Sequence, residues 1–99
     1  MTPLIIITST LSPCYPNPSR IGNEIKFNFR VGGLEGTTRN VELKVYNILG
    51  KLVAEVVNGD RLVNDYTETW KPINLSNGVY FYQLKTDNYS EVKKMMITK

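Results

Sequence analysis

The sequence predicts an all-β fold built as a single domain. The chain has 99 residues, which is the length of one globular domain and leaves no room for a second. Apolar and polar residues alternate with period two along most of the chain, and glycine, proline, asparagine and aspartate recur between the alternating stretches. No stretch has a good helical i, i+3, i+4 spacing of apolar residues. These observations predict short strands joined by turns.

The first 57 residues contain four expected strands. The apolar run near the N-terminus predicts a strand at 5–9. The clearest strand is 24–31, where apolar residues alternate with polar ones and form one buried face. A glycine-rich loop separates it from a strand at 41–48, and a tight turn containing Gly50 leads back into a strand at 52–57.

The second half contains three more expected strands. Asn58-Gly59-Asp60 is a turn signal, and the strand at 66–71 that follows ends at a proline. The strand at 79–86 is apolar on both faces at its start, which indicates a central position covered on both sides. The last strand, 91–98, ends next to Lys99.

Seven short strands in a chain of this length predict an antiparallel sandwich of two sheets with an immunoglobulin-like architecture. The expected strands are 5–9, 24–31, 41–48, 52–57, 66–71, 79–86 and 91–98.

Composition argues against most enzymes. The sequence contains no histidine and one cysteine, Cys14, so it has no Ser–His or Cys–His pair, no His-ligated metal site and no internal disulfide. With 12 basic and 9 acidic residues the net charge is +3, which does not indicate a nucleic-acid partner. No apolar run approaches the ~20 residues of a membrane-spanning helix. We therefore expect a non-catalytic domain with no cofactor, no bound metal and no membrane span.

Two groups of polar residues have both a functional and a structural interpretation. Oxygen-bearing side chains around one turn suit calcium, but the same residues are typical of turns; they are Asn58, Asp60, Asn64 and Asp65. Lys93, Lys94 and Lys99 suit contact with phosphate or anionic lipid, but they also protect an edge strand against unwanted pairing.

The aromatic residues have the same ambiguity. Tyr80 and Tyr82 form a candidate carbohydrate platform if their rings are exposed at the surface. Trp70 and Phe81 are expected between the sheets, because aromatic side chains in a small sandwich usually fill the core.

Several short motifs occur in a fixed order between residues 12 and 99. They are Tyr15-Pro16-Asn17-Pro18, Val45-Tyr46-Asn47-Ile48-Leu49-Gly50, Trp70, the run Leu75 to Leu84, and Lys93-Lys94-Met95-Met96-Ile97-Thr98-Lys99. In this order and spacing the chain resembles the type A C-terminal sorting domain of the type IX secretion system of Bacteroidetes-like bacteria. The same motifs occur in the immunoglobulin-like domain related to the flagellar hook-cap protein.

The resemblance implies a secretion module with no catalytic role. Such a domain follows a cargo protein, which this chain does not include, and directs the cargo from the periplasm across the outer membrane to the cell surface or beyond. Its implied partners are the outer-membrane secretion machinery and a sortase-like peptidase. The implied recognition residues are Pro16, Pro18, Gly78, Tyr80, Lys93, Lys94, Met95, Met96, Ile97 and Lys99. The alternative is an accessory module of an extracellular enzyme that braces a neighbouring domain or binds carbohydrate.

Overall fold

The computed structural model describes residues 6–99, and this part of the chain is all-β, with ten strands and no helix. The strands are β1 (Ile6–Ile7), β2 (Thr10–Leu11), β3 (Ser19–Arg20), β4 (Ile25–Val31), β5 (Gly33–Leu34), β6 (Thr38–Asn47), β7 (Leu52–Leu62), β8 (Asn64–Trp70), β9 (Gly78–Thr86) and β10 (Tyr89–Thr98). Of the expected strand at 5–9, only β1 is a strand, since β2 begins just beyond it, and its first residue, Ile5, lies outside the described residues.

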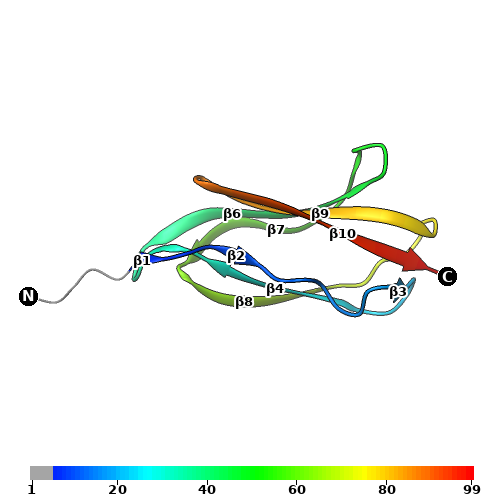
Figure 1. The fold of residues 1–99 in the computed structure, drawn as a ribbon, viewed down its shortest axis with the longest axis horizontal. Helices are drawn as coiled ribbons and strands as arrows, with labels where there is room; N and C mark the ends of the chain where they lie inside the picture. Colours follow the sequence, from blue (N-terminus) through cyan, green and yellow to red (C-terminus); the bar gives the residue numbers. More distant parts are fainter. Residues whose placement is uncertain (1–5) are drawn as a thin grey trace, which may run out of the picture.

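Two layers of strands enclose the core, as Figure 1 shows. One is a five-stranded sheet in the order β3-β10-β9-β6-β7, and the other is a three-stranded sheet in the order β2-β4-β8. A third, two-stranded sheet of β1 and β5 lies at the end of the molecule opposite the C-terminus (Figure 1). The structure thus has ten strands in three sheets where seven strands in two sheets were expected. The three additional strands are only two residues long, too short to show periodicity in the sequence.

The strand directions also differ from the expectation at one place. Every pair of neighbouring strands in the described residues is antiparallel except β3 and β10, which run parallel with Ser19 opposite Ile97 and Arg20 opposite Thr98. Parallel pairing needs a long connection. Nearly the whole chain separates these two strands, so no local pattern in the sequence predicts this contact.

Alternation along β4 and β6 places their apolar residues in the core as expected. Ile25, Phe27, Phe29 and Val31 of β4 are buried, and the polar residues between them face outward. In the other layer, Val41, Leu43 and Val45 of β6 are fully buried and face the same core. The Phe27 ring contacts the Tyr82 ring from the other layer, with ring centroids 5.1 Å apart.

The inward face of β9 is the opposite of the one expected. Tyr80, Tyr82 and Leu84 are buried, whereas Phe81 is half-buried on the outer face, opposite Tyr46 and Lys94 of the neighbouring strands. Both faces of β9 are apolar, so alternation alone does not determine which one is buried. The pairing with β6 decides it, because Leu84 lies opposite the buried Leu43 and Tyr82 opposite the buried Val45.

Trp70 also departs from the expectation of a core residue. It is half-buried at the margin of the core, where it stacks on Phe27.

The expected turn at Asn58-Gly59-Asp60 lies inside a strand. β7 continues to Leu62 because β6 starts at Thr38, earlier than expected, and pairs with it along its whole length. The chain changes layer only at Val63, whose N–H donates to the Thr37 carbonyl at 2.9 Å. The local turn signal is therefore overridden by a partner strand.

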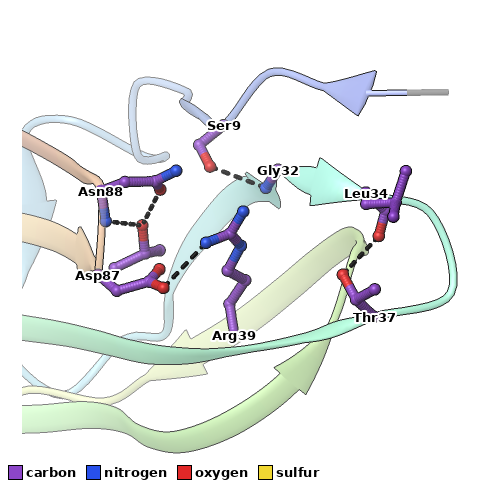
Figure 2. Close-up of polar contacts among 8 residues, drawn as sticks. Ser9, Gly32, Leu34, Thr37, Arg39, Asp87 and Asn88 are labelled. Carbon is purple, nitrogen blue, oxygen red and sulfur yellow. Dashed lines mark hydrogen bonds and ion pairs between the residues drawn. The ribbon is translucent and has the colours of Figure 1, made fainter. Parts of the chain in front are cut away.

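Gly32 brings the N-terminal segment against the rest of the fold. Its N–H donates to Ser9 Oγ at 2.8 Å (Figure 2), and a Cβ at this position would lie 2.3 Å from the Ser9 nitrogen. Only glycine permits so close an approach of two backbones. Nearby, Arg39 forms an ion pair with Asp87 at 2.9 Å, also visible in Figure 2.

The orientation of β9 predicts unequal costs for two phenylalanine truncations. Phe27→Ala removes a fully buried ring and should lower the free energy of unfolding by roughly 3–5 kcal/mol. Phe81→Ala should cost about 1–2 kcal/mol, because part of this ring is already exposed to water. Urea denaturation of both variants measures the difference. Equal costs would contradict the assignment of Tyr80 and Tyr82 to the inner face.

Candidate functional site

Most of the residues singled out by the motifs lie at one end of the molecule. The segment Pro16–Pro18 leads directly into β3, which pairs with the last two residues of β10. On the other side of β10, Gly78 at the start of β9 lies opposite Ile97. Figure 1 shows β3, the end of β10 and the start of β9 together at the end that carries the C-terminus. The fold thus joins the first and last motifs, which are far apart in the sequence.

Asn17 makes the contact between these two motifs. Its Nδ2 donates to the Lys94 carbonyl at 3.5 Å, and its Oδ1 accepts the Met96 N–H at 2.9 Å. Pro16 and Pro18, which flank it, have no backbone N–H to offer to an adjacent strand. The side-chain amide of Asn17 therefore provides the donor and acceptor that a neighbouring strand would otherwise provide.

The segment around Asn17 is fixed by further hydrogen bonds. Both flanking prolines follow cis peptide bonds. The buried Ser19 hydroxyl donates to the Pro16 carbonyl, and the Ile21 N–H donates to the Thr98 carbonyl at 2.7 Å. Sequence reasoning quoted the Pro-Asn-Pro motif but missed the role of Asn17. The sequence did offer a signal. Asn17 has a side-chain amide that can both donate and accept a hydrogen bond, and it stands between two prolines that lack a backbone N–H.

Period-two alternation divides the terminal motif into an inner and an outer set. Met95 and Ile97 are buried in the core, whereas Lys94 is exposed and Met96 is 44% exposed on the outer face. Lys93 is half-buried and forms an ion pair with Glu91 at 3.2 Å. Lys99, which follows β10, is exposed. Of the terminal motif, only Lys94, Met96 and Lys99 are openly accessible to a partner.

The two tyrosines considered as a carbohydrate platform are buried. Tyr80 is 6% exposed and its hydroxyl donates to the Ser76 carbonyl at 2.7 Å, while Tyr82 is 1% exposed. A sugar ring needs an exposed aromatic face, so this placement argues against the platform. Tyr80 instead supports the position of the turn that precedes Gly78.

Tyr82 and Cys14 connect the two layers beneath the terminal strand. The Cys14 N–H donates to Tyr82 Oη at 2.9 Å, and the buried Cys14 sulfur lies 3.9 Å from the sulfur of Met95. Burial raises the pKa of the Cys14 thiol, and it raises the pKa of Tyr82 to about 12. Both groups are therefore neutral at physiological pH, and they serve packing rather than nucleophilic chemistry.

The residues considered for calcium do not form a ligand set. Asn58 and Asp60 lie within β7, while Asp65 pairs with Arg30 at 2.6 Å, and this contact lowers the pKa of the Asp65 carboxyl. Residues 6–99 contain no group of three or more acidic or cysteine side chains arranged to hold a metal. In the same range, no helix is long and apolar enough to cross a membrane.

The accessible surface at this end includes a small hollow. It has a volume of about 90 Å³ and is lined by Asn17, Val79, Lys94, Met95 and Met96. It combines apolar walls, a cationic margin and an amide, which suits contact with a protein side chain better than enclosure of a small molecule.

The Asn17 contact predicts a specific change in hydrogen exchange. In Asn17→Ala the Met96 amide loses its acceptor and should exchange faster, while the Met95 amide, which faces β9, should be unaffected. Asn17→Asp keeps an oxygen acceptor and should preserve the protection of Met96. NMR-detected exchange on the three proteins tests this. Unchanged protection in Asn17→Ala would show that Asn17 does not hold the strand.

The buried phenol predicts a loss of stability in alkali. The pKa of Tyr82 rises from about 10 in the unfolded chain to about 12 in the fold. The stability that the neutral Tyr82 phenol contributes is therefore fully present below about pH 10. It is lost as the pH rises from about 10 to about 12. Tyr82→Phe should reduce the fall in unfolding free energy between about pH 8 and pH 11, measured by urea titration. The same fall in both proteins would contradict this assignment. Tyr89, whose pKa burial also raises to about 12, is present in both proteins and leaves the comparison intact.

Comparison with known protein families finds one family model that matches most of the chain. The family described as the secretion system C-terminal sorting domain matches residues 13–98, from the Pro-Asn-Pro motif to the end of β10. No curated protein matches the sequence. The match covers most of the chain and includes both motifs that meet at the Asn17 contact. The chain therefore belongs to the family of C-terminal sorting domains of the type IX secretion system.

Proposed function

We propose that this domain is the export signal of a cargo protein and acts through its C-terminal end. The family supports a C-terminal sorting role, and the observation that carries the more detailed proposal is the contact between the Pro-Asn-Pro segment and β10. The contact presents residues from both ends of the chain as one surface. We assign recognition to the accessible side chains there, Lys94, Met96 and Lys99, together with Pro16 and Pro18.

The other motif residues act by supporting this surface. Met95 and Ile97 bury the inner face of β10, and Gly78 and Tyr80 fix the start of β9 beside it. Lys93 is held by Glu91. In this proposal the domain is an immunoglobulin-like scaffold and has no catalytic role. Its partners are the outer-membrane secretion machinery and a sortase-like peptidase, and its destination is the cell surface or the medium.

The geometry leaves room for a cargo. β1 lies at the opposite end of the molecule from the end of β10 (Figure 1). A protein joined ahead of β1 would therefore not cover the surface around Lys94 and Met96. This supports testing export with a reporter placed at the N-terminal side.

Substitution of the outer residues tests the proposal better than truncation, because deletion of residues 93–99 also removes Met95 and Ile97 from the core. A periplasm-targeted fluorescent protein is fused ahead of the chain and expressed in a bacterium with type IX secretion. Lys94→Glu combined with Met96→Ser should reduce exported fluorescence by about tenfold or more, because central interface residues carry most of the binding energy.

A matched control makes the same changes on the other edge of the sheet, at Lys51→Glu with Leu52→Ser. Leu52 is 48% exposed, close to the 44% of Met96, so the two double variants alter similar surface. The control should be exported normally, and thermal unfolding should show that both remain folded. Normal export of the Lys94 and Met96 variant would refute the assigned surface. Periplasmic retention of the unmodified, folded fusion would refute the export function and favour an accessory module.

A further inference from the structure

β10 has a free edge beside the proposed recognition surface. One side of β10 pairs with β9 along nine residues, from Tyr89 to Ile97. On the other side, β3 pairs only with Ile97 and Thr98, and Asn17 reaches the backbone of Lys94 and Met96. Within residues 6–99, no strand covers the stretch from Tyr89 to Lys93 on this side. This leaves a short sheet edge with unpaired backbone groups.

Alternation identifies which groups face this edge. The Lys94 carbonyl, the Met96 N–H and the Thr98 carbonyl all point away from β9, toward Asn17 and β3. In an antiparallel ladder every second residue directs its backbone groups to the same side. The N–H and carbonyl of Ser90 and Val92, and the N–H of Lys94, therefore also point to the open side. Five groups in this spacing match the hydrogen-bonding pattern of one added strand.

The edge has a defined end. Asn17 occupies the positions beside Lys94 and Met96, and β3 continues from there. An added strand must therefore stop at Lys94 and would lie roughly in line with β3. On the outer face Val92 is 54% exposed, and it offers an apolar contact to a β-branched or aromatic residue of the incoming strand.

A second copy of the chain fits this edge poorly. Two copies could pair antiparallel through this open stretch in two registers. A register centred on Glu91 places two carboxylates opposite each other. A register centred on Val92 places Ser90 opposite Lys94, whose carbonyl already accepts from Asn17. The edge therefore favours a strand of different sequence.

We propose that the β10 edge from Ser90 to Lys94 is a docking surface for an extended strand of the secretion machinery, which adds to the five-stranded sheet. The partner's identity rests on the proposed function. Strand addition supplies affinity through the backbone, while side chains such as Val92, Lys94 and Met96 supply specificity.

A proline at position 92 tests the edge without disturbing the ladder. The Val92 N–H points to the open side, where proline is tolerated, so Val92→Pro removes one donor for the added strand and keeps the pairing with β9. Val92→Ala changes the side chain but keeps the N–H. The probe is the detergent-solubilised type IX outer-membrane translocon. Val92→Pro should weaken its binding to the reporter fusion by about tenfold, and Val92→Ala by much less.

Hydrogen exchange provides a test that needs no variant. In the free chain, the amides of Ser90, Val92 and Lys94 should exchange faster than those of Glu91, Lys93 and Met95. Addition of the translocon should slow exchange in peptides covering residues 89–94. Equal protection of all six amides in the free chain would overturn the proposal, because the edge would already be covered.

The outcomes separate the two proposals. If the unmodified fusion is exported and both Val92 variants bind and are exported like it, the strand-addition proposal fails and the export function stands. If Val92→Ala loses as much binding as Val92→Pro, the side chain rather than the edge is recognised, and the proposal also fails. If the unmodified fusion is not exported, the export function fails. Edge protection that appears only at higher chain concentration would indicate self-pairing and would overturn the heterologous partner.

Discussion

The attachment of residues 16–21 to the end of β10 is the contact on which the proposed functional surface depends. Parallel pairing of β3 with β10, the two hydrogen bonds of Asn17 and the bond from Ile21 to Thr98 act together here. Before this point the chain lies along the three-stranded sheet, where the Tyr15 N–H donates to the Lys26 carbonyl. Between Tyr15 and Ser19 it crosses to the other layer. The crossing closes one side of the core and brings the proline motif to the terminal strand.

Just before this crossing, one backbone group is directed toward the core. Tyr15 still pairs with Lys26 of β4, but the N–H of Cys14 has no strand partner. Tyr82 provides one from the opposite layer through its hydroxyl, at 2.9 Å. A buried N–H without an acceptor would cost stability, so the phenol is both a core side chain and a hydrogen-bond partner. This arrangement accounts for a tyrosine rather than a phenylalanine at a position that is 1% exposed.

Alternation along β10 separates stability from recognition within one short motif. Met95 and Ile97 hold the strand against the core, and the alternating residues Lys94 and Met96 face the solvent. Truncation therefore affects folding and surface chemistry together, whereas substitution of the outer residues affects the surface alone. Asn17 also marks where the open edge of β10 ends. Recognition of the Lys94 and Met96 side chains and addition of a strand to this edge would therefore occur at adjacent positions. A short edge that ends at Asn17 also offers little template for uncontrolled pairing.

The sequence by itself determined the features that depend on local alternation and on residue chemistry. These are the all-β class, the buried face of β4, the lack of a histidine-based site and the ordered motifs of the family. Tertiary structure decided the rest. The inward face of β9 was set by Val45 and Leu43 on β6, because β9 is apolar on both faces. A partner strand extended β7 through a local turn signal at Asn58–Asp60. The role of Asn17 depends on backbone groups of Lys94 and Met96 that are nearly the whole chain away, and a local pattern carries no information about a contact at that separation.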